Sequence, residues 1–207
     1  MCPNVSRRTV LAAGSLAASL LALSQVAAQA EPQGSLTKRW TSKKSQNGWP
    51  ILSTGTWHRI EGTNVSVQLG EVSTATIILL HVARRYSYEI ETLREDEVRG
   101  FVDSGTVQHD FESNYLSGTA IGLRPALYPT GVANLLYPRE LVIVQDIIEE
   151  MADVVIWGGT MSVINESHFE IALPPNHPRI NQVADYLMSE ENTPSRSFAG
   201  RRNAFKS

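Results

Sequence analysis

The sequence predicts an α+β fold in which helices flank a small mixed sheet. Apolar residues recur at helical spacing in some segments and alternate with polar residues in others, but the two kinds do not follow a regular β-α-β order. The 207 residues suffice for one domain with terminal extensions. The formal net charge is −3, and no basic stripe runs along the chain. We therefore expect no nucleic-acid partner.

The N-terminus is predicted to be a twin-arginine-type signal peptide, residues 1–30. Arg7 and Arg8 precede the mildly apolar run 10–28, which ends in the small-x-small cleavage pattern Ala28-Gln29-Ala30. An ordinary secretory signal that contains two arginines is the alternative. In either case the protein is expected to be secreted or held in the cell envelope, without stable membrane insertion after the signal is removed.

Two other segments are expected to lie outside the folded domain. Residues 31–46 are polar and predict a flexible arm, and the basic, Ser-rich residues 191–207 predict a disordered tail. The arm contains a basic cluster, which we interpret as solvated; it consists of Lys38, Arg39, Lys43 and Lys44. The only cysteine, Cys2, lies in the signal, so the domain must be stable without a disulfide.

The elements of the domain, residues 47–190, follow in order. A short alternating run predicts a strand at 65–69, and a strongly apolar run predicts a helix at 71–86 that ends in arginines, which favour the helix dipole. Alternation predicts further strands, and apolar residues at helical spacing after Pro138 predict a second helix. The remaining expected strands are 86–91, 101–102, 117–123, 154–157 and 168–173, and the last expected helix is 178–188.

Two short segments indicate a function. The first runs from Ser113 to Gly122 and reads SNYLSGTAIG; the second joins Trp157-Gly158-Gly159 to residues 165–170, NESHFE. Together they resemble the zinc D-alanyl-D-alanine carboxypeptidases of the vancomycin-resistance type and their secreted actinobacterial branch. That family carries S-x-H-x-x-G-x-A-x-D in the first segment. In the second it carries an acidic residue three positions before a histidine.

The resemblance implies a hedgehog/DD-peptidase-like fold, a zinc cofactor and peptidoglycan stem peptides as partners. In the family, two histidines and an aspartate hold zinc, which leaves a fourth position for water. The acidic residue of the second segment then acts as general base. The products are a shortened stem peptide and free D-alanine.

This chain departs from that pattern at most functional positions. The ligand positions hold Tyr115, Gly122 and His168, so only the last matches. The position of the general base holds Asn165, and Glu166 follows one residue later as a weak candidate for a displaced base. A neutral phenol is a poor ligand and glycine offers no side chain. We therefore expect no bound cofactor, although zinc is the cofactor of the family.

Other residues are candidates for secondary roles. Ser113 matches the family motif, while Arg84 and Arg85 could hold a substrate carboxylate through paired N–H donors. Surface ion pairs at a helix end are the plainer interpretation of these arginines. His109 and Asp110 lie just before the first segment and could join a relocated metal site.

Three functions stay open at this point. The first is a catalytically inactive carboxypeptidase-like protein whose cleft binds peptidoglycan peptides. The second is an active zinc carboxypeptidase or endopeptidase with substituted ligands, which requires Tyr115, His168, Glu166 or His109 to meet around one ion. The third is a secreted interaction protein that uses the fold as a stable body and carries a large exposed apolar patch.

Overall fold

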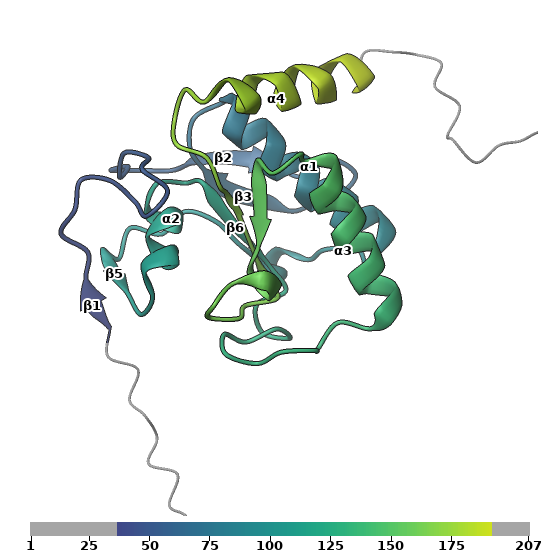
Figure 1. Ribbon diagram of the computed structural model, residues 1–207, viewed down its shortest axis with the longest axis horizontal. Helices are drawn as coiled ribbons and strands as arrows, with labels where there is room; N and C mark the ends of the chain where they lie inside the picture. The colour runs from purple at the N-terminus through teal and green to yellow at the C-terminus, as the bar shows by residue number, and fades with distance from the viewer. Residues whose placement is uncertain (1–36, 192–207) are drawn as a thin grey trace, which may run out of the picture. The chain divides into compact units, whose positions relative to one another are not determined.

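The computed structural model describes residues 37–191, which form an α+β domain (Figure 1). A central sheet has the strand order β4-β6-β8-β7, and two further pairs are β1-β5 and β2-β3. The strands are β1 (Lys38–Arg39), β2 (Thr56–Arg59), β3 (Ser66–Leu69), β4 (Val98–Arg99), β5 (Thr106–Val107), β6 (Ala120–Leu123), β7 (Val155–Trp157) and β8 (His168–Ile171). The helices are α1 (Thr74–Glu89), α2 (Ser113–Leu116), α3 (Pro138–Glu150) and α4 (Pro178–Glu191), with 3₁₀ turns η1 (Glu95–Glu97), η2 (Asp110–Glu112) and η3 (Gly158–Thr160).

The central sheet is antiparallel in every described pairing, which corrects the mixed sheet expected from the sequence. Parallel neighbours require a crossover connection, usually a helix. Here the segment between β6 and β8 contains α3 and then β7, which pairs antiparallel with β8. The α+β class is therefore confirmed, while the arrangement of the strands differs from the expectation.

The hydrophobic core lies between the central sheet and α1. Alternate residues of β6 and β8 point to this side and are fully buried, among them Ile121 and Phe169. The ring of Phe169 meets Tyr86 of α1 edge-on, with centroids 6.4 Å apart. Each such large apolar side chain contributes roughly 1.5–3 kcal/mol when buried. The intervening residues of both strands therefore face the opposite side of the sheet.

Three predicted boundaries can be compared with the structure. Helix α1 begins at an N-cap, Ser73, and continues to Glu89, so the strand expected at 86–91 is wrong. The alternating pattern at 86–91 does not indicate a strand, because residues two positions apart can also lie on different faces of a helix. Tyr86 is buried, whereas Tyr88 is 81% exposed. The strand expected at 101–102 is also wrong, since β4 ends at Arg99. The predicted helix start at Pro138 is confirmed.

The N-terminal segment makes specific contacts where the structure describes it. Strand β1 pairs with β5, and the ammonium of Lys38 forms an ion pair with the carboxylate of Asp110. Further along, the backbone N–H of Gln46 donates to Ser113 Oγ (2.8 Å). The expected signal peptide, the start of the expected arm and nearly all of the expected tail lie outside the described residues. Between residues 37 and 191, no helix combines the length and apolar character that crossing a bilayer requires.

Candidate functional site

The three positions of the motif, 115, 122 and 168, meet at one point on the face of the sheet that lies away from α1. Gly122 on β6 and His168 on β8 are direct partners in the antiparallel register. Tyr115 reaches them from α2, which a tight turn at Gly118 joins to β6. Gly118 has φ +65°, and a Cβ there would lie 2.4 Å from the backbone nitrogen of Gly70, so only glycine fits.

A phenol occupies the centre of this site. The hydroxyl of Tyr115 lies 2.8 Å from Nδ1 of His168. A Cβ on Gly122 would lie 3.0 Å from the same hydroxyl oxygen and 3.3 Å from Cβ of Arg99. The side chain of Tyr115 thus occupies space that a side chain at position 122 would need.

The hydrogen bonds continue from His168 into a buried chain. Nε2 of His168 lies 2.7 Å from Oε2 of Glu170, which also accepts a hydrogen bond from the side-chain amide of Asn114 (2.6 Å). With an ionised Glu170 and a neutral imidazole, Nε2–H donates to the carboxylate and Nδ1 accepts from Tyr115. Asn114 Oδ1 in turn accepts the backbone N–H of Asn47 (3.2 Å). Each side chain of this hydrogen-bonded series, Tyr115, His168, Glu170 and Asn114, then has a partner.

The site is closed to solvent. His168 is fully buried, and Tyr115 is only 2% exposed. The ring of Phe111 packs edge-on against the imidazole with centroids 4.8 Å apart, and the guanidinium of Arg99 lies 4.6 Å from the centre of the Tyr115 ring. Burial raises the pKa of the Tyr115 hydroxyl, a trend that Arg99 opposes and that Glu112 and Glu170 reinforce. The phenol is therefore neutral at working pH.

The residues present do not fit a catalytic zinc. Such an ion needs about three protein donors, usually histidine nitrogens or carboxylate oxygens, around one point. Here one donor position is Gly122, the second holds a neutral phenol, and both nitrogens of His168 already have hydrogen-bond partners. Among residues 37–191, no cluster of three histidine, cysteine, aspartate or glutamate side chains could hold a metal ion.

Asn165 and Glu166 both have structural partners. The amide nitrogen of Asn165 donates to Thr130 Oγ1 (2.9 Å), and its oxygen accepts from the hydroxyl of Ser167 (2.6 Å). The carboxylate of Glu166 turns to the loop before α3 and accepts consecutive backbone N–H groups, those of Asn134, Leu135 and Leu136. Glu166 is 6% exposed, and these three bonds hold its carboxylate against the loop.

The candidate substrate-binding residues are occupied by intramolecular contacts. Ser113 is fully buried and donates to the carbonyl of Asp110 (2.6 Å). Arg84 pairs with Glu61 (2.6 Å), and Arg85 makes ion pairs with carboxylates on α1 and α3. Helix α1 covers the core side of the sheet, so these arginines and His168 lie on opposite sides of it. The sequence placed the arginines at the end of the helix, but α1 continues beyond them to Glu89.

A small polar cleft adjoins the closed site. It has a volume of about 410 Å³. Its walls include Phe111, which contacts His168, and His109, whose ring stacks on Phe111 at a centroid distance of 5.8 Å. Lys38 and Asp110 also line it. His109 and Asp110 therefore lie beside the cleft and do not join Tyr115 and His168 around one point.

Sequence reasoning missed several residues of the site. Glu170 and Asn114 complete the buried chain, while Arg99 and Phe111 cover it. The alternation along β8 offered one signal, because Glu170 is two residues after His168 and therefore shares its face.

Comparison of the chain with protein-family models, with curated proteins and with solved structures gave no match.

Proposed function

We propose that this chain is an exported, non-catalytic relative of the zinc D-alanyl-D-alanine carboxypeptidases that binds peptidoglycan peptides in the cleft beside its closed site. The observation that carries the proposal is the meeting of Tyr115, Gly122 and His168 at one point. These are the three positions that the motif resemblance assigns to zinc ligands. The motif was aligned by sequence alone, so their proximity supports a hedgehog/DD-peptidase-like scaffold.

The chemistry of the site supports a non-catalytic role. Hydrolysis of a peptide in this way requires an activated water and a base that accepts its proton. The position of the base holds Asn165, an amide, and Glu166 is committed to backbone N–H groups of a neighbouring loop. His168 is fully buried beneath Phe111, so a substrate carbonyl has no path to it in this arrangement.

The binding role rests on the cleft at the edge of the site. A volume of about 410 Å³ suits a short peptide, and the lining places the Lys38–Asp110 ion pair next to the aromatic ring of Phe111. This composition suits a ligand with polar main-chain groups and charged ends. An active enzyme with substituted ligands is the rival function, and it would need Glu166 or His109 to move to the point where Tyr115 meets His168.

Restoring the ligands tests the scaffold. The double substitution Tyr115→His with Gly122→Asp should bind about one zinc ion per chain, because the smaller imidazole frees the space that the introduced carboxylate needs. Gly122→Asp alone is the matched control, since Tyr115 would still occupy that space. Elemental analysis after dialysis measures the zinc. A double variant that folds but retains no zinc would contradict the assignment of these positions.

Two measurements on the unaltered protein test the rest. The wild-type chain should retain less than about a tenth of a zinc ion and release no D-alanine from a stem pentapeptide. A full equivalent of zinc that is lost in His168→Ala would favour the active enzyme instead.

Calorimetric titration with the same pentapeptide should show binding that weakens in Phe111→Ala, and the absence of any heat would overturn the binding role.

A further inference from the structure

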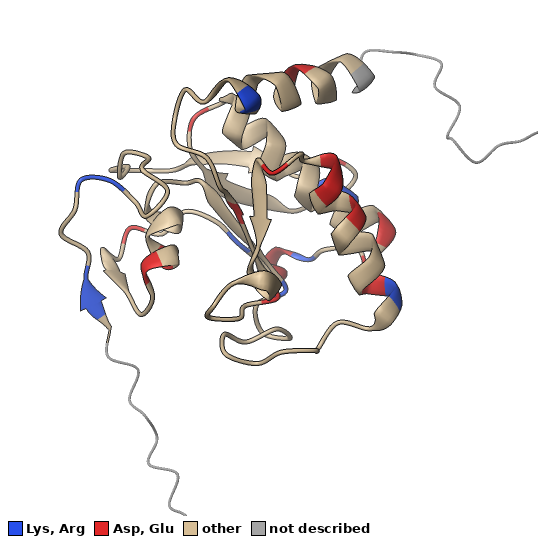
Figure 2. Cartoon of the chain, viewed as in Figure 1, with Lys and Arg blue, Asp and Glu red and all other residues tan. Residues whose placement is uncertain are grey.

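A second group of ionisable side chains lies on the opposite side of the central sheet, around His81 of α1. Nε2 of His81 lies 3.1 Å from Oε2 of Glu150 on α3. Its other nitrogen, Nδ1, lies 2.9 Å from Nη2 of Arg84, one turn later on α1. The His81 side chain is only 11% exposed. Figure 2 shows acidic positions, in red, along α3, the helix that supplies Glu150.

This geometry suits only the neutral imidazole. Arginine is always charged and has no acceptor, so Nδ1 must accept from Arg84 and the ring proton must lie on Nε2, toward Glu150. Glu150 is ionised, because its hydrogen bonds with His81 and Arg85 lower its pKa from 4.5 to about 2. A second ring proton, on Nδ1, would point at the guanidinium of Arg84 and turn an attraction into a repulsion.

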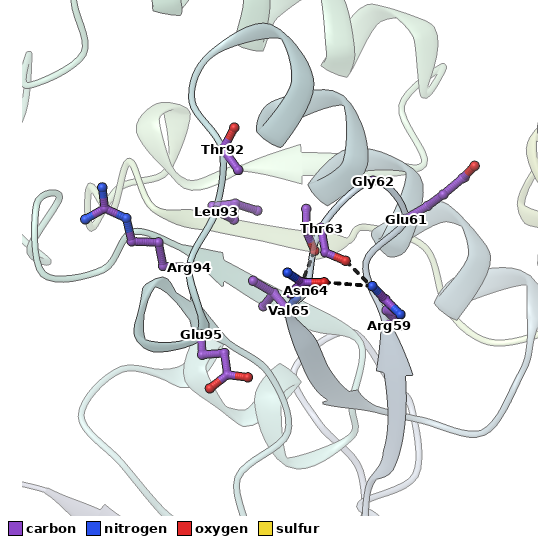
Figure 3. A pocket seen from close by; sticks show the side chains of 10 residues that line it. All are labelled: Arg59, Glu61, Gly62, Thr63, Asn64, Val65, Thr92, Leu93, Arg94 and Glu95. Atoms are coloured by element: carbon purple, nitrogen blue, oxygen red, sulfur yellow. Dashed lines mark hydrogen bonds between the residues drawn. The ribbon is translucent and has the colours of Figure 1, made fainter.

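Arg84 connects the imidazole to the turn between β2 and β3. Its Nη1 donates to Glu61 of that turn at 2.6 Å. The same turn is braced by Arg59, which donates to the carbonyl of Thr63 and to Asn64 Oδ1, both at 2.9 Å. Figure 3 shows the two bonds of Arg59 and the residues that line a cleft between this turn and residues 92–95. The cleft has a volume of about 830 Å³. A shift of Arg84 therefore acts through Glu61 on the wall of this cleft.

We propose that His81 is a proton-sensitive latch: its neutral form holds Arg84 against the β2–β3 turn, and its protonation releases Arg84 and loosens the turn at the cleft. Histidine is the side chain that ordinarily changes charge between pH 5 and 8. The proposal does not depend on the peptide-binding function. Several charged groups face His81 or its partners on the packed elements; they are Arg84, Arg85 and Glu89 on α1, Asp146 and Glu150 on α3, and Arg59 and Glu61 at the turn.

The surrounding charges explain why the break falls on Arg84 rather than on Glu150. Protonated His81 still donates through Nε2 to an ionised carboxylate, and that bond becomes stronger as a charge-assisted pair. Only the bond at Nδ1 changes sign. Loss of one hydrogen bond to a charged group lowers local stability enough for a roughly ten-fold effect on opening of the turn.

Amide hydrogen exchange of the whole chain tests the latch. Protection factors of the Thr63 and Val65 amides, which donate to the Ile60 carbonyl and to Thr63 Oγ1 at this turn, should fall about ten-fold between about pH 7.5 and about pH 5.5 in the wild type. In His81→Gln they should not change, because glutamine accepts and donates at any pH. His177→Gln, which alters a histidine outside this network, is the matched control and should behave as the wild type.

A second variant keeps the test decisive should His81→Gln fold poorly. Arg84→Gln removes the guanidinium from the network, so at about pH 7.5 its turn should already show the low protection of the acid state and should lose no more at about pH 5.5. Turn protection that is independent of pH in the wild type would overturn the proposal. So would an equal pH dependence in the wild type and in Arg84→Gln.

Discussion

The hydroxyl of Tyr115 and Nδ1 of His168 lie 2.8 Å apart and join helix α2 to the central strand β8. Both groups are excluded from solvent, so each depends on the other for its hydrogen bond. The bond links the same elements that a shared metal ion would link through side chains at these positions. At this point a side-chain hydrogen bond, together with the packing of Phe111 on the imidazole, holds the two elements together.

Removing the Tyr115 hydroxyl should destabilise the domain. Tyr115→Phe leaves Nδ1 of His168 buried without a partner, which costs about 1–3 kcal/mol. Urea unfolding followed by tryptophan fluorescence measures the loss. Tyr88→Phe is the matched control, because Tyr88 is 81% exposed and its substitution should change stability by less than about 0.5 kcal/mol. Equal stabilities of the two variants would show that the bond contributes nothing.

A side chain at position 122 should conflict with Tyr115. Gly122→Ala places a Cβ 3.0 Å from the Tyr115 hydroxyl and should cost about 1–3 kcal/mol through overpacking. In a Tyr115→Phe background the same substitution should cost less, because the oxygen is gone. A double-mutant cycle from urea unfolding measures this coupling. Strict additivity of the two substitutions would contradict the close contact.

The loop before α3 should depend on Glu166. Glu166→Ala removes the acceptor of the Asn134, Leu135 and Leu136 amides and should cost about 3 kcal/mol. Glu166→Gln keeps the shape and an acceptor oxygen, so it should lose less. Limited proteolysis should cut the alanine variant first within residues 127–137. An alanine variant as resistant as the wild type would show that other contacts hold the loop.

Acid should weaken the joint between α1 and α3. The pKa of Glu150 is lowered from 4.5 to about 2 by hydrogen bonds with His81 and Arg85. Its contribution to stability is therefore complete above about pH 4.5 and is lost as pH falls toward about 2. Glu150→Gln should lose stability at neutral pH and show a flatter decline across this acid range. Urea midpoints across the range test it, and parallel curves for both proteins would refute it.

Much of the fold could be predicted from local pattern. The helix start at Pro138 and the strand start at His168 are correct, although the strand ends at Ile171. Proline limits where a helix can begin, and strict alternation of apolar and polar residues is typical of a strand. The strand expected at 86–91 failed because α1 is extended by packing of Tyr86 in the core. That contact with Phe169 joins residues far apart in sequence, and local propensity does not contain it.

The candidate site divides in the same way. The order of residues alone establishes that positions 115, 122, 165 and 168 hold tyrosine, glycine, asparagine and histidine. How these side chains are paired depends on the folded chain, because hydrogen bonds among buried groups require distances that are set between separate elements. Packing places the phenol of Tyr115 on His168 and Glu170 behind the imidazole. It also places Glu166 on a loop that lies 30 to 32 residues earlier in the chain. The sequence determined which residue stands at each position, and packing determined which of these residues are hydrogen-bonded to one another.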